Sequence, residues 1–120
     1  MVKLLIVDDA AFLRMRLKKL LVASGYDVVE APNGEKAVEA YKIETPDMVL
    51  MDVHMPIMNG LEALQEIMKI DKKAKVVMLS SFSQQETIMK ALEFGAKNFL
   101  IKPYEEKSLL STIAKVVSLD

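Results

Sequence analysis

Residues 4–9 read LLIVDD, an apolar run that ends at two adjacent carboxylates. Residues 48–52 repeat this arrangement as MVLMD, again four apolar residues followed by an aspartate. Continuous apolar runs of this length, without the alternation of a half-exposed strand, indicate strands that are covered on both faces, as in a parallel sheet. A third run of this kind stands at residues 76–79, and shorter apolar runs at 28–29 and 99–101 complete a set of five expected strands.

Segments with helical spacing separate these runs, because apolar residues recur there at intervals of three and four. The positions that form the apolar faces are Leu13, Leu17, Leu20 and Leu21; Leu61, Leu64, Ile67 and Met68; Ile88, Ala91 and Leu92; and Leu109, Ile113, Val116 and Val117. Strands that alternate with helices through right-handed crossovers form an open α/β sheet with helices on both faces. The sequence therefore predicts a (βα)5 doubly wound parallel sheet in a single domain over residues 1–120.

Glycines and capping residues support the same boundaries. Gly25 and Gly95 stand where helices are expected to end, since glycine tolerates the left-handed conformation of a C-terminal cap. Two pairs have the spacing of a helix N-cap with a capping-box acid three residues later, Asn59 with Glu62 and Ser83 with Glu86.

The composition excludes several classes of function. Of the 120 residues, 52% are hydrophobic and 28% are charged, as in globular domains. The formal net charge of −1 gives no electrostatic reason to bind nucleic acid or an anionic membrane. The absence of cysteine excludes disulfides and thiolate metal sites, and no apolar run approaches the roughly 18 residues of a membrane helix. The N-terminus reaches Asp8 too early for a secretory signal, so we expect a cytoplasmic protein. No feature demands a dimer, and we expect a monomer with a single domain and no output domain.

Polar side chains follow four of the five expected strands. These are Asp8 and Asp9 after the first, Asp52 after the third, Ser80 after the fourth and Lys102 after the fifth. Each by itself has an ordinary explanation as a helix N-cap, a loop residue or a solvated charge. In open α/β sheets, however, ligands bind beyond the carboxyl ends of the strands, where the strand order reverses. We therefore expect these side chains to converge on one edge of the sheet.

The residue types suit phosphoryl transfer. Three carboxylates within a few ångströms repel one another, and a hard divalent cation relieves that repulsion. Oxygen-only ligation favours Mg²⁺, with Mn²⁺ as the alternative, over zinc. Lys102 would add a positive charge and Ser80 a hydroxyl donor, and phosphoryl transfer needs little beyond positioning and charge stabilisation. Because aspartate is a known nucleophile toward phosphorus, we interpret the site as an aspartate that accepts a phosphoryl group.

Four segments together suggest a family. They read VDDAAFLRMRL at 7–17, MDVHMPIMNG at 51–60, LSSFSQQ at 79–85 and FLIKPY at 99–104. In this order they resemble the receiver domains of two-component response regulators, closest to the single-domain receivers of chemotaxis. The resemblance covers essentially the whole chain. It implies the flavodoxin-like strand order 2-1-3-4-5, in which the ends of strands one and three are neighbours.

The resemblance also implies roles for the acids. Asp52 corresponds to the phosphoacceptor. Asp8 and Asp9 correspond to the acidic pair that holds Mg²⁺, with Asp9 ligating directly and Asp8 acting largely through water. The backbone carbonyl of His54 corresponds to a further metal ligand. Lys102 matches the lysine that contacts the phosphate, and in this family the peptide bond before the following proline is cis.

Two further residues match the family's switch. Ser80 corresponds to the hydroxyl that would move toward the phosphoryl oxygens, and Phe99 to the aromatic ring that would fill the space it leaves. Many chemotaxis receivers have tyrosine at the aromatic position, so a role for a ring hydroxyl is absent here. The expected outcome is a changed surface on the fourth helix, fifth strand and fifth helix, which a partner recognises.

Two weaker hypotheses concern exposed side chains. His54 and Phe82 each lie two positions beyond a site residue, where a bulky ring could slow the attack of water on the phosphoryl group. Met89 and Phe94 could be exposed and, with Phe99 and Tyr104, form a patch for a partner.

The resemblance implies partners and leaves alternatives open. The expected donor is a sensor histidine kinase, that of chemotaxis in particular, and the expected target is a flagellar motor switch protein or another effector. A phosphatase is a further candidate partner. The alternatives are a stand-alone phosphorelay intermediate, or a receiver excised from a transcription factor. A Mg²⁺-dependent phosphatase with an aspartate nucleophile fits less well, because such enzymes place a second aspartate where this chain has His54.

Overall fold

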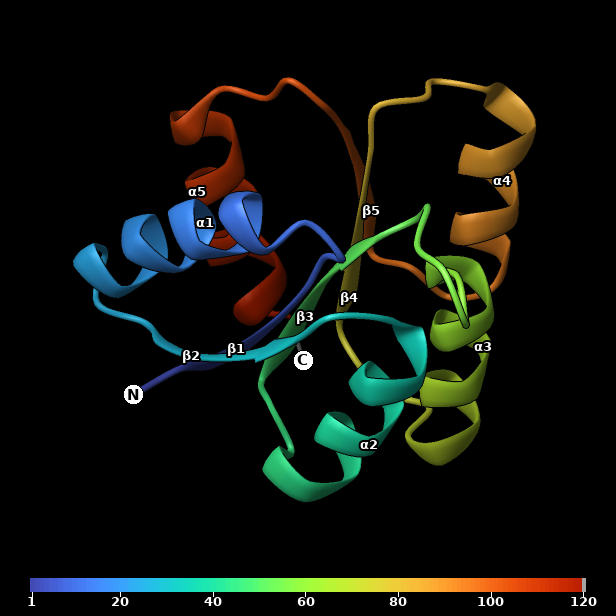
Figure 1. Ribbon diagram of the computed structural model, residues 1–120, viewed down its shortest axis with the longest axis horizontal. Coiled ribbons are helices and arrows are strands. Elements are labelled where there is room, and N and C mark those ends of the chain that lie inside the picture. Colours follow the sequence, from blue (N-terminus) through green and yellow to red (C-terminus); the bar gives the residue numbers. More distant parts are fainter. Residues whose placement is uncertain (120) are drawn as a thin grey trace.

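The computed structural model describes residues 1–119, which form the predicted alternation of strands and helices (Figure 1). In chain order the elements are β1 (Lys3–Val7), α1 (Ala11–Ala23), β2 (Asp27–Ala31), α2 (Gly34–Glu44), β3 (Met48–Asp52), α3 (Gly60–Ile70), β4 (Val76–Ser80), α4 (Gln85–Glu93), β5 (Asn98–Ile101) and α5 (Glu106–Val117). The strands pair in parallel in the order β2-β1-β3-β4-β5. This confirms the doubly wound sheet and the strand order that the family resemblance implied.

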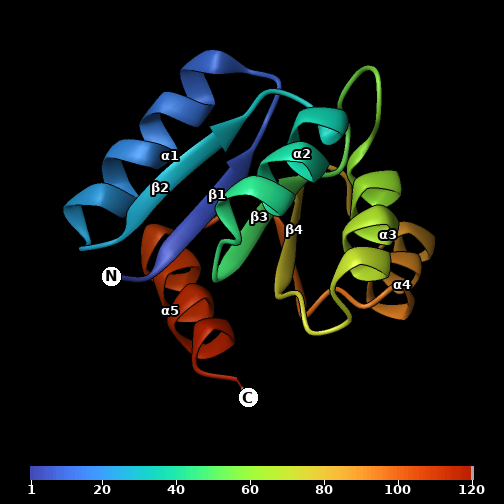
Figure 2. The same ribbon diagram turned by 90° about the horizontal axis from the view of Figure 1, so that it is seen from below.

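The sheet separates two apolar cores, and β1 contributes to both. Leu5 and Val7 pack in the core beneath α2, α3 and α4, whereas Leu4 and Ile6 pack in the core beneath α1 and α5 (Figure 2). All four side chains are at most 2% exposed. Burial on both faces accounts for the continuous apolar runs in the sequence, since no residue of such a strand faces water.

The register of the central strands brings the acids level with one another. Val7 of β1 pairs with Met51 of β3, so the residues that follow, Asp8 and Asp52, emerge at the same edge of the sheet. At that edge the chain leaves β1 for α1 on one face and β3 for α3 on the other (Figures 1 and 2). This is the reversal point at which open α/β sheets bind ligands.

Most of the predicted helix signals are present. Asn59 accepts a hydrogen bond from the amide of Glu62, whose side chain accepts one from the amide of Asn59, which completes the capping box. Gly25 and Gly95 have φ values of 96° and 111°, as expected beyond helix C-termini. The N-cap prediction for Ser83 is wrong. Helix α4 begins one residue later than that cap requires, its N-cap is Gln84, and no side chain caps it.

Within residues 1–119, none of the helices combines the length and the apolar character needed to cross a bilayer.

Helix α3 begins unusually close to the end of β3. The amide of Gly60 donates to the carbonyl of Val53 at 2.8 Å. A β-carbon at position 60 would lie 2.1 Å from the carbonyl oxygen of Asp52, closer than any real contact. Only glycine therefore allows this approach, which fixes the backbone that carries the Asp52 carboxylate.

We predict that Gly60→Ala lowers the free energy of unfolding by about 2–3 kcal/mol, because the backbone of β3 or α3 must move to admit the methyl group. Urea denaturation followed by circular dichroism measures this. Gly25→Ala is the control, since its methyl group would meet no atom within 4 Å and only its positive φ opposes the change, at about 1 kcal/mol. Equal losses in the two variants would contradict the steric explanation.

A buried tyrosine joins α2 to the end of α3. Tyr41 is 6% exposed, and its hydroxyl donates to Asp71 Oδ2 at 2.7 Å. This bond, with a second from the amide of Lys73, lowers the pKa of the Asp71 carboxyl. A carboxyl group with a lowered pKa in the folded state stabilises the fold above its ordinary pKa, and this contribution disappears as the pH falls through the lowered value.

We predict that Tyr41→Phe lowers the free energy of unfolding by about 1 kcal/mol at neutral pH. The difference from the parent should shrink as the pH falls from about 4, the ordinary pKa of an aspartate, through the lowered pKa of folded Asp71, below which the carboxyl is protonated in both states. Denaturation at a series of pH values measures it, with Tyr26→Phe as a control that removes a hydroxyl from the other core. A difference that does not change with pH would mean that Asp71 is not the relevant partner.

Candidate functional site

Three carboxylates meet where β1 and β3 end. One oxygen from each of Asp8, Asp9 and Asp52 can be chosen so that all lie within 4.8 Å of one another. Asp8 and Asp52 are each 8% exposed, whereas Asp9 is exposed to solvent. The predicted convergence of the acids is therefore present, with two acids buried at the edge of the sheet and one exposed to solvent.

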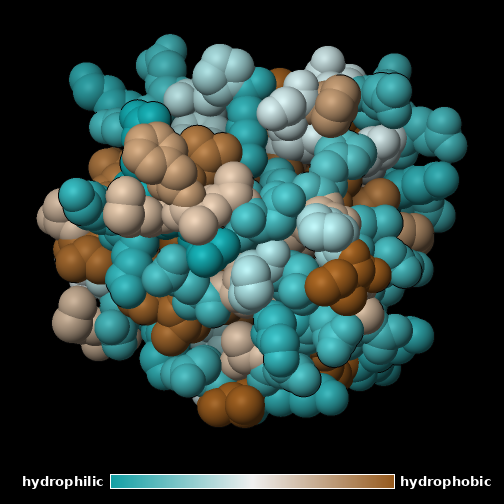
Figure 3. Space-filling model, in the orientation of Figure 1, coloured by the Kyte–Doolittle hydropathy of each residue, from teal (hydrophilic) through white to brown (hydrophobic). Residues whose placement is uncertain are grey.

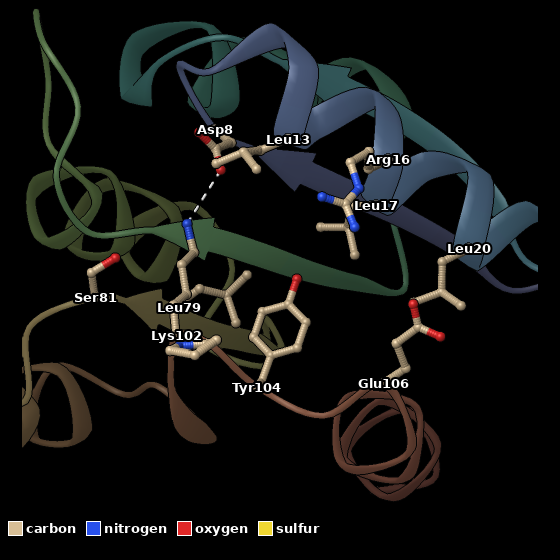
Figure 4. Close-up of a pocket in the computed structure, with 11 residues that line it drawn as sticks. Asp8, Leu13, Arg16, Leu17, Leu20, Leu79, Ser81, Lys102, Tyr104 and Glu106 are labelled. Carbon is tan, nitrogen blue, oxygen red and sulfur yellow. Dashed lines mark hydrogen bonds and ion pairs between the residues drawn. The ribbon is translucent and has the colours of Figure 1, made fainter.

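Lys102, directly after β5, lies between the two buried acids. Its Nζ is 3.0 Å from Asp52 Oδ1 and 3.3 Å from Asp8 Oδ2; Figure 4 draws the second contact. The Lys102–Pro103 peptide bond is cis, as the family resemblance implied. The ammonium group thus offsets part of the repulsion between two carboxylates that are largely removed from water.

Burial and charge act in opposite directions on these groups. Burial raises the pKa of Asp52 above its ordinary value, and the negative charges of Asp8 and Asp9 add to this, although Lys102 opposes it. Burial by itself would lower the pKa of Lys102, but its hydrogen bond to Asp52 and the neighbouring negative charges raise it. The lysine therefore stays charged, while the ionised form of Asp52 is less favourable than that of a solvated aspartate.

Asp8 is held through every polar group it has. Its amide donates to the carbonyl of Ala31, its Oδ1 accepts from the amide of Ala10 at 2.9 Å, and its Oδ2 faces Lys102. Its carbonyl accepts from Arg14 at 2.6 Å. Asp9, by contrast, forms no side-chain hydrogen bond to another residue in the described chain. Direct ligation of a metal by Asp9 and water-mediated ligation by Asp8 remain predictions.

Arg14 is a residue of this site that the sequence analysis missed. It lies in the first turn of α1, where a cation opposes the helix dipole, and this placement is the only signal that the sequence offered. Its Nε is also 3.0 Å from Glu30 in β2, and the arginine side chain is only 18% exposed. Arg14 therefore ties the loop that carries the acids to the edge strand of the sheet.

The donor set suits a hard divalent cation. The three acids offer only oxygen, and they stand close enough to share one ion. Asp8, Asp9 and Asp52 would hold Mg²⁺.

His54 and Phe82, the two rings that follow the site residues Asp52 and Ser80, contact each other. His54 is exposed, and its ring meets Phe82 edge to face with centroids 4.8 Å apart. The proposed ligation by the His54 carbonyl remains a prediction.

The two predicted switch residues lie on neighbouring strands. Ser80 is fully buried, and its Oγ accepts a hydrogen bond from the amide of Phe82 at 3.0 Å. Met78 of β4 pairs with Phe99 of β5, and both belong to the core beneath α2, α3 and α4. Side chains two positions apart on a strand share a face, so Ser80 points to the same side as Phe99.

The predicted partner patch is not one surface. Met89 is 60% exposed, but Phe94 is half-buried and packs with Phe99 against the core beneath α4. Tyr104 packs against the other core, with α1 and α5. Phe94, at the C-terminal cap of α4, thus covers part of the sheet. The spacing of the apolar residues in the sequence did not predict this contact.

Comparisons with known proteins agree with this geometry. The chemotaxis protein CheY of Thermotoga maritima is 48% identical over 115 residues, which cover 95% of this chain and 96% of that protein. CheY of Bacillus subtilis is 47% identical over 97% of this chain and 98% of the relative. A CheX–CheY complex of Borrelia burgdorferi with BeF3 and magnesium contains a chain that superposes with a TM-score of 0.93 at 33% identity, covering 98% of this chain and 90% of that one.

The family assignment rests on the match across the chain as well as on individual relatives. Residues 4–114 match the response regulator receiver domain, a span that includes the three acids, Ser80 and Lys102. The chain belongs to the response regulator receiver domain family.

Proposed function

We propose that this receiver is a phosphorylation-activated signalling switch in which Asp52 accepts a phosphoryl group from a phosphohistidine of a histidine kinase. The observation that carries the proposal is the position of Lys102, 3.0 Å from Asp52 and 3.3 Å from Asp8. An ammonium group at that point can contact the negatively charged phosphoryl oxygens when an Asp52 oxygen becomes bonded to phosphorus. The protein would turn over only its own phosphoryl group, so it acts as a switch and not as a metabolic enzyme.

In the proposed reaction an oxygen of Asp52 forms a bond to phosphorus while the bond from phosphorus to the donor imidazole breaks. The imidazole nitrogen leaves with the bonding electron pair and takes a proton from water. Lys102 and the Ser80 hydroxyl donate to the phosphoryl oxygens and stabilise the charge that develops on them. Bound Mg²⁺ would neutralise negative charge on the acids and the phosphoryl oxygens. In dephosphorylation, water attacks the phosphorus, the bond between the Asp52 oxygen and phosphorus breaks, and inorganic phosphate leaves the free carboxylate behind.

The conformational step would start at Ser80. Its Oγ now accepts from the amide of Phe82, and a phosphoryl oxygen on Asp52 would offer its hydroxyl a charge-assisted partner. Movement of Ser80 toward Asp52 would free space on the face that it shares with Phe99, into which the ring could turn. Phe99 and Phe94 both pack against the core beneath α4, so the ring movement would alter the surface of α4, β5 and α5.

The relatives suggest the setting. The curated relatives named CheY support a chemotaxis kinase as the donor and a flagellar motor switch protein as the target. The CheX–CheY complex of Borrelia burgdorferi supports a phosphatase of the CheX kind as a further partner. A phosphorelay intermediate and a receiver from a transcription factor are the alternatives within the family; a regulatory protein of Mycobacterium tuberculosis, PdtaR, is 38% identical over 57% of its length.

We predict that incubation with acetyl phosphate and Mg²⁺ adds one phosphoryl group to the parent, seen as an increase in intact mass. Asp52→Asn should show no addition, because the amide cannot attack phosphorus, and chelation of the metal should slow the addition in the parent. Asp27→Asn is the matched control, since it makes the same change at an exposed acid outside the site. Equal labelling of Asp52→Asn and the parent would refute the assignment of the acceptor.

We predict that beryllofluoride with Mg²⁺, which mimics the phosphorylated state, shifts amide NMR signals of α4 and β5 as well as those around Asp52. Ser80→Ala should keep the shifts near Asp52 but lose those from Gln85 to Phe99, because the hydroxyl connects the two regions. Ser111→Ala, which removes a hydroxyl in α5, is the control. Signals of α4 and β5 that do not move in the parent would contradict the switch while leaving the phosphorylation chemistry intact.

A further inference from the structure

A cavity adjoins the site, and most of the residues that line it have no role in the proposed reaction. It has a volume of about 580 Å³ and lies between α1 and the segment that leads from β5 into α5 (Figure 4). Leu13, Leu17 and Leu20 of α1 line one side, and Tyr104 lines the other. Cavities that hold small organic ligands measure about 300–1,000 Å³ and are mainly apolar with a few polar groups. We call this cavity the α1–α5 groove.

The groove exists because α1 covers its sheet face incompletely. Of the 13 residues of α1 only Leu21 is fully buried, and Leu13 remains 46% exposed. In the view of Figure 3, apolar side chains gather at the upper left, over α1 and α5, on an otherwise largely hydrophilic face. The leucines that line the groove are therefore apolar surface that the folded chain itself leaves partly open to water.

Besides Lys102, which is already paired with Asp8 and Asp52, two hydrogen-bond donors face this apolar groove. Arg16 lines it from α1, with its guanidinium carbon 5.8 Å from the centre of the Phe12 ring. The Tyr104 hydroxyl points across the groove toward α1 (Figure 4). Among residues 1–119 neither Arg16 nor the Tyr104 hydroxyl has a side-chain hydrogen bond or an ion pair. Burial, the largest effect, raises the pKa of Tyr104, so the hydroxyl remains a donor at neutral pH.

We propose that the α1–α5 groove binds a small amphipathic anion, an aromatic or medium-chain carboxylate or sulfonate. Its apolar body would lie against the leucines and the Tyr104 ring, and its charge would take the donors of Arg16 and Tyr104. The cation–π contact with Phe12 holds the guanidinium group beforehand, which reduces the entropy lost on binding. Glu106, on the opposite wall from Arg16, disfavours a second negative charge and limits the ligand to one.

The test uses anilinonaphthalene sulfonate, an aromatic anion whose fluorescence rises in apolar surroundings, with uncharged phenylnaphthylamine as the comparison. The chain has no tryptophan, so the protein contributes little background. The parent should bind the sulfonate saturably at one site. Arg16→Gln should weaken it about tenfold and leave the uncharged probe unaffected. Tyr104→Phe should weaken the sulfonate about threefold, and Glu106→Gln should strengthen it about twofold.

Lys19→Gln is the matched control, because it removes the same charge from an exposed position of α1 that does not line the groove. Failure of the sulfonate to saturate, or an equal loss of affinity in Arg16→Gln and Lys19→Gln, would overturn the proposal. So would weaker binding of the uncharged probe by Arg16→Gln, since that would indicate damage to the helix and not loss of a charge contact.

The groove shares two residues, Asp8 and Lys102, with the acidic site. An anion bound by Arg16 and Tyr104 would add negative charge next to Asp8 and the other acids. Saturating sulfonate should therefore tighten Mg²⁺ binding at least about twofold, measured by calorimetry, and Mg²⁺ should tighten sulfonate binding by the same factor. This coupling, unlike the groove itself, rests on the proposed metal site. Mg²⁺ binding without the probe tests that site, and probe binding without Mg²⁺ tests the groove, so the two failures are distinguishable.

Discussion

The repulsion among three carboxylates at one edge of a dry sheet is the constraint around which this molecule is arranged. Two of the acids are almost fully buried, and a single ammonium group lies between them. Buried charges of one sign are tolerated only when opposite charges or hydrogen bonds compensate them. Here the compensation comes from the far end of the sheet, because Lys102 follows β5 while the acids follow β1 and β3. The whole width from β1 to β5 must therefore be folded before the acids are stabilised.

The rest of the scaffold keeps the acids in place. Glycine at position 60 lets α3 press against the peptide of Asp52, and Arg14 fastens the peptide of Asp8 to Glu30 in β2. Of the three acids, only Asp9 has no side-chain hydrogen bond or ion pair within residues 1–119. A site with two fixed acids and one acid without a side-chain partner could accept a cation with little rearrangement of the backbone.

The sequence predicted the parts of this structure that depend on local pattern. Continuous apolar runs identified the buried strands, because apolar side chains are the ones readily buried on both faces of a sheet. Polar residues at the ends of these runs identified the acids and Lys102, because polar side chains avoid the interior of the sheet. The signals that depend on tertiary contacts were weaker. Ser83 has the spacing of a cap, but α4 starts at Gln85; Phe94 falls off the apolar stripe, but it packs at the helix end. The partners of Arg14 lie in two other elements, and no spacing along the chain encodes them.

Burial of β1 on both faces has a consequence for how the strands find their alignment. Leu4 and Ile6 face one core and Leu5 and Val7 the other, so a slip by one residue would exchange the faces without exposing an apolar side chain. Apolar content alone thus discriminates poorly between correct and shifted pairings. The terminal aspartates do discriminate, because a shift that drew Asp52 inward would place an unpaired carboxylate among hydrocarbon side chains. The acids at the strand ends therefore also disfavour misaligned strand pairings during folding.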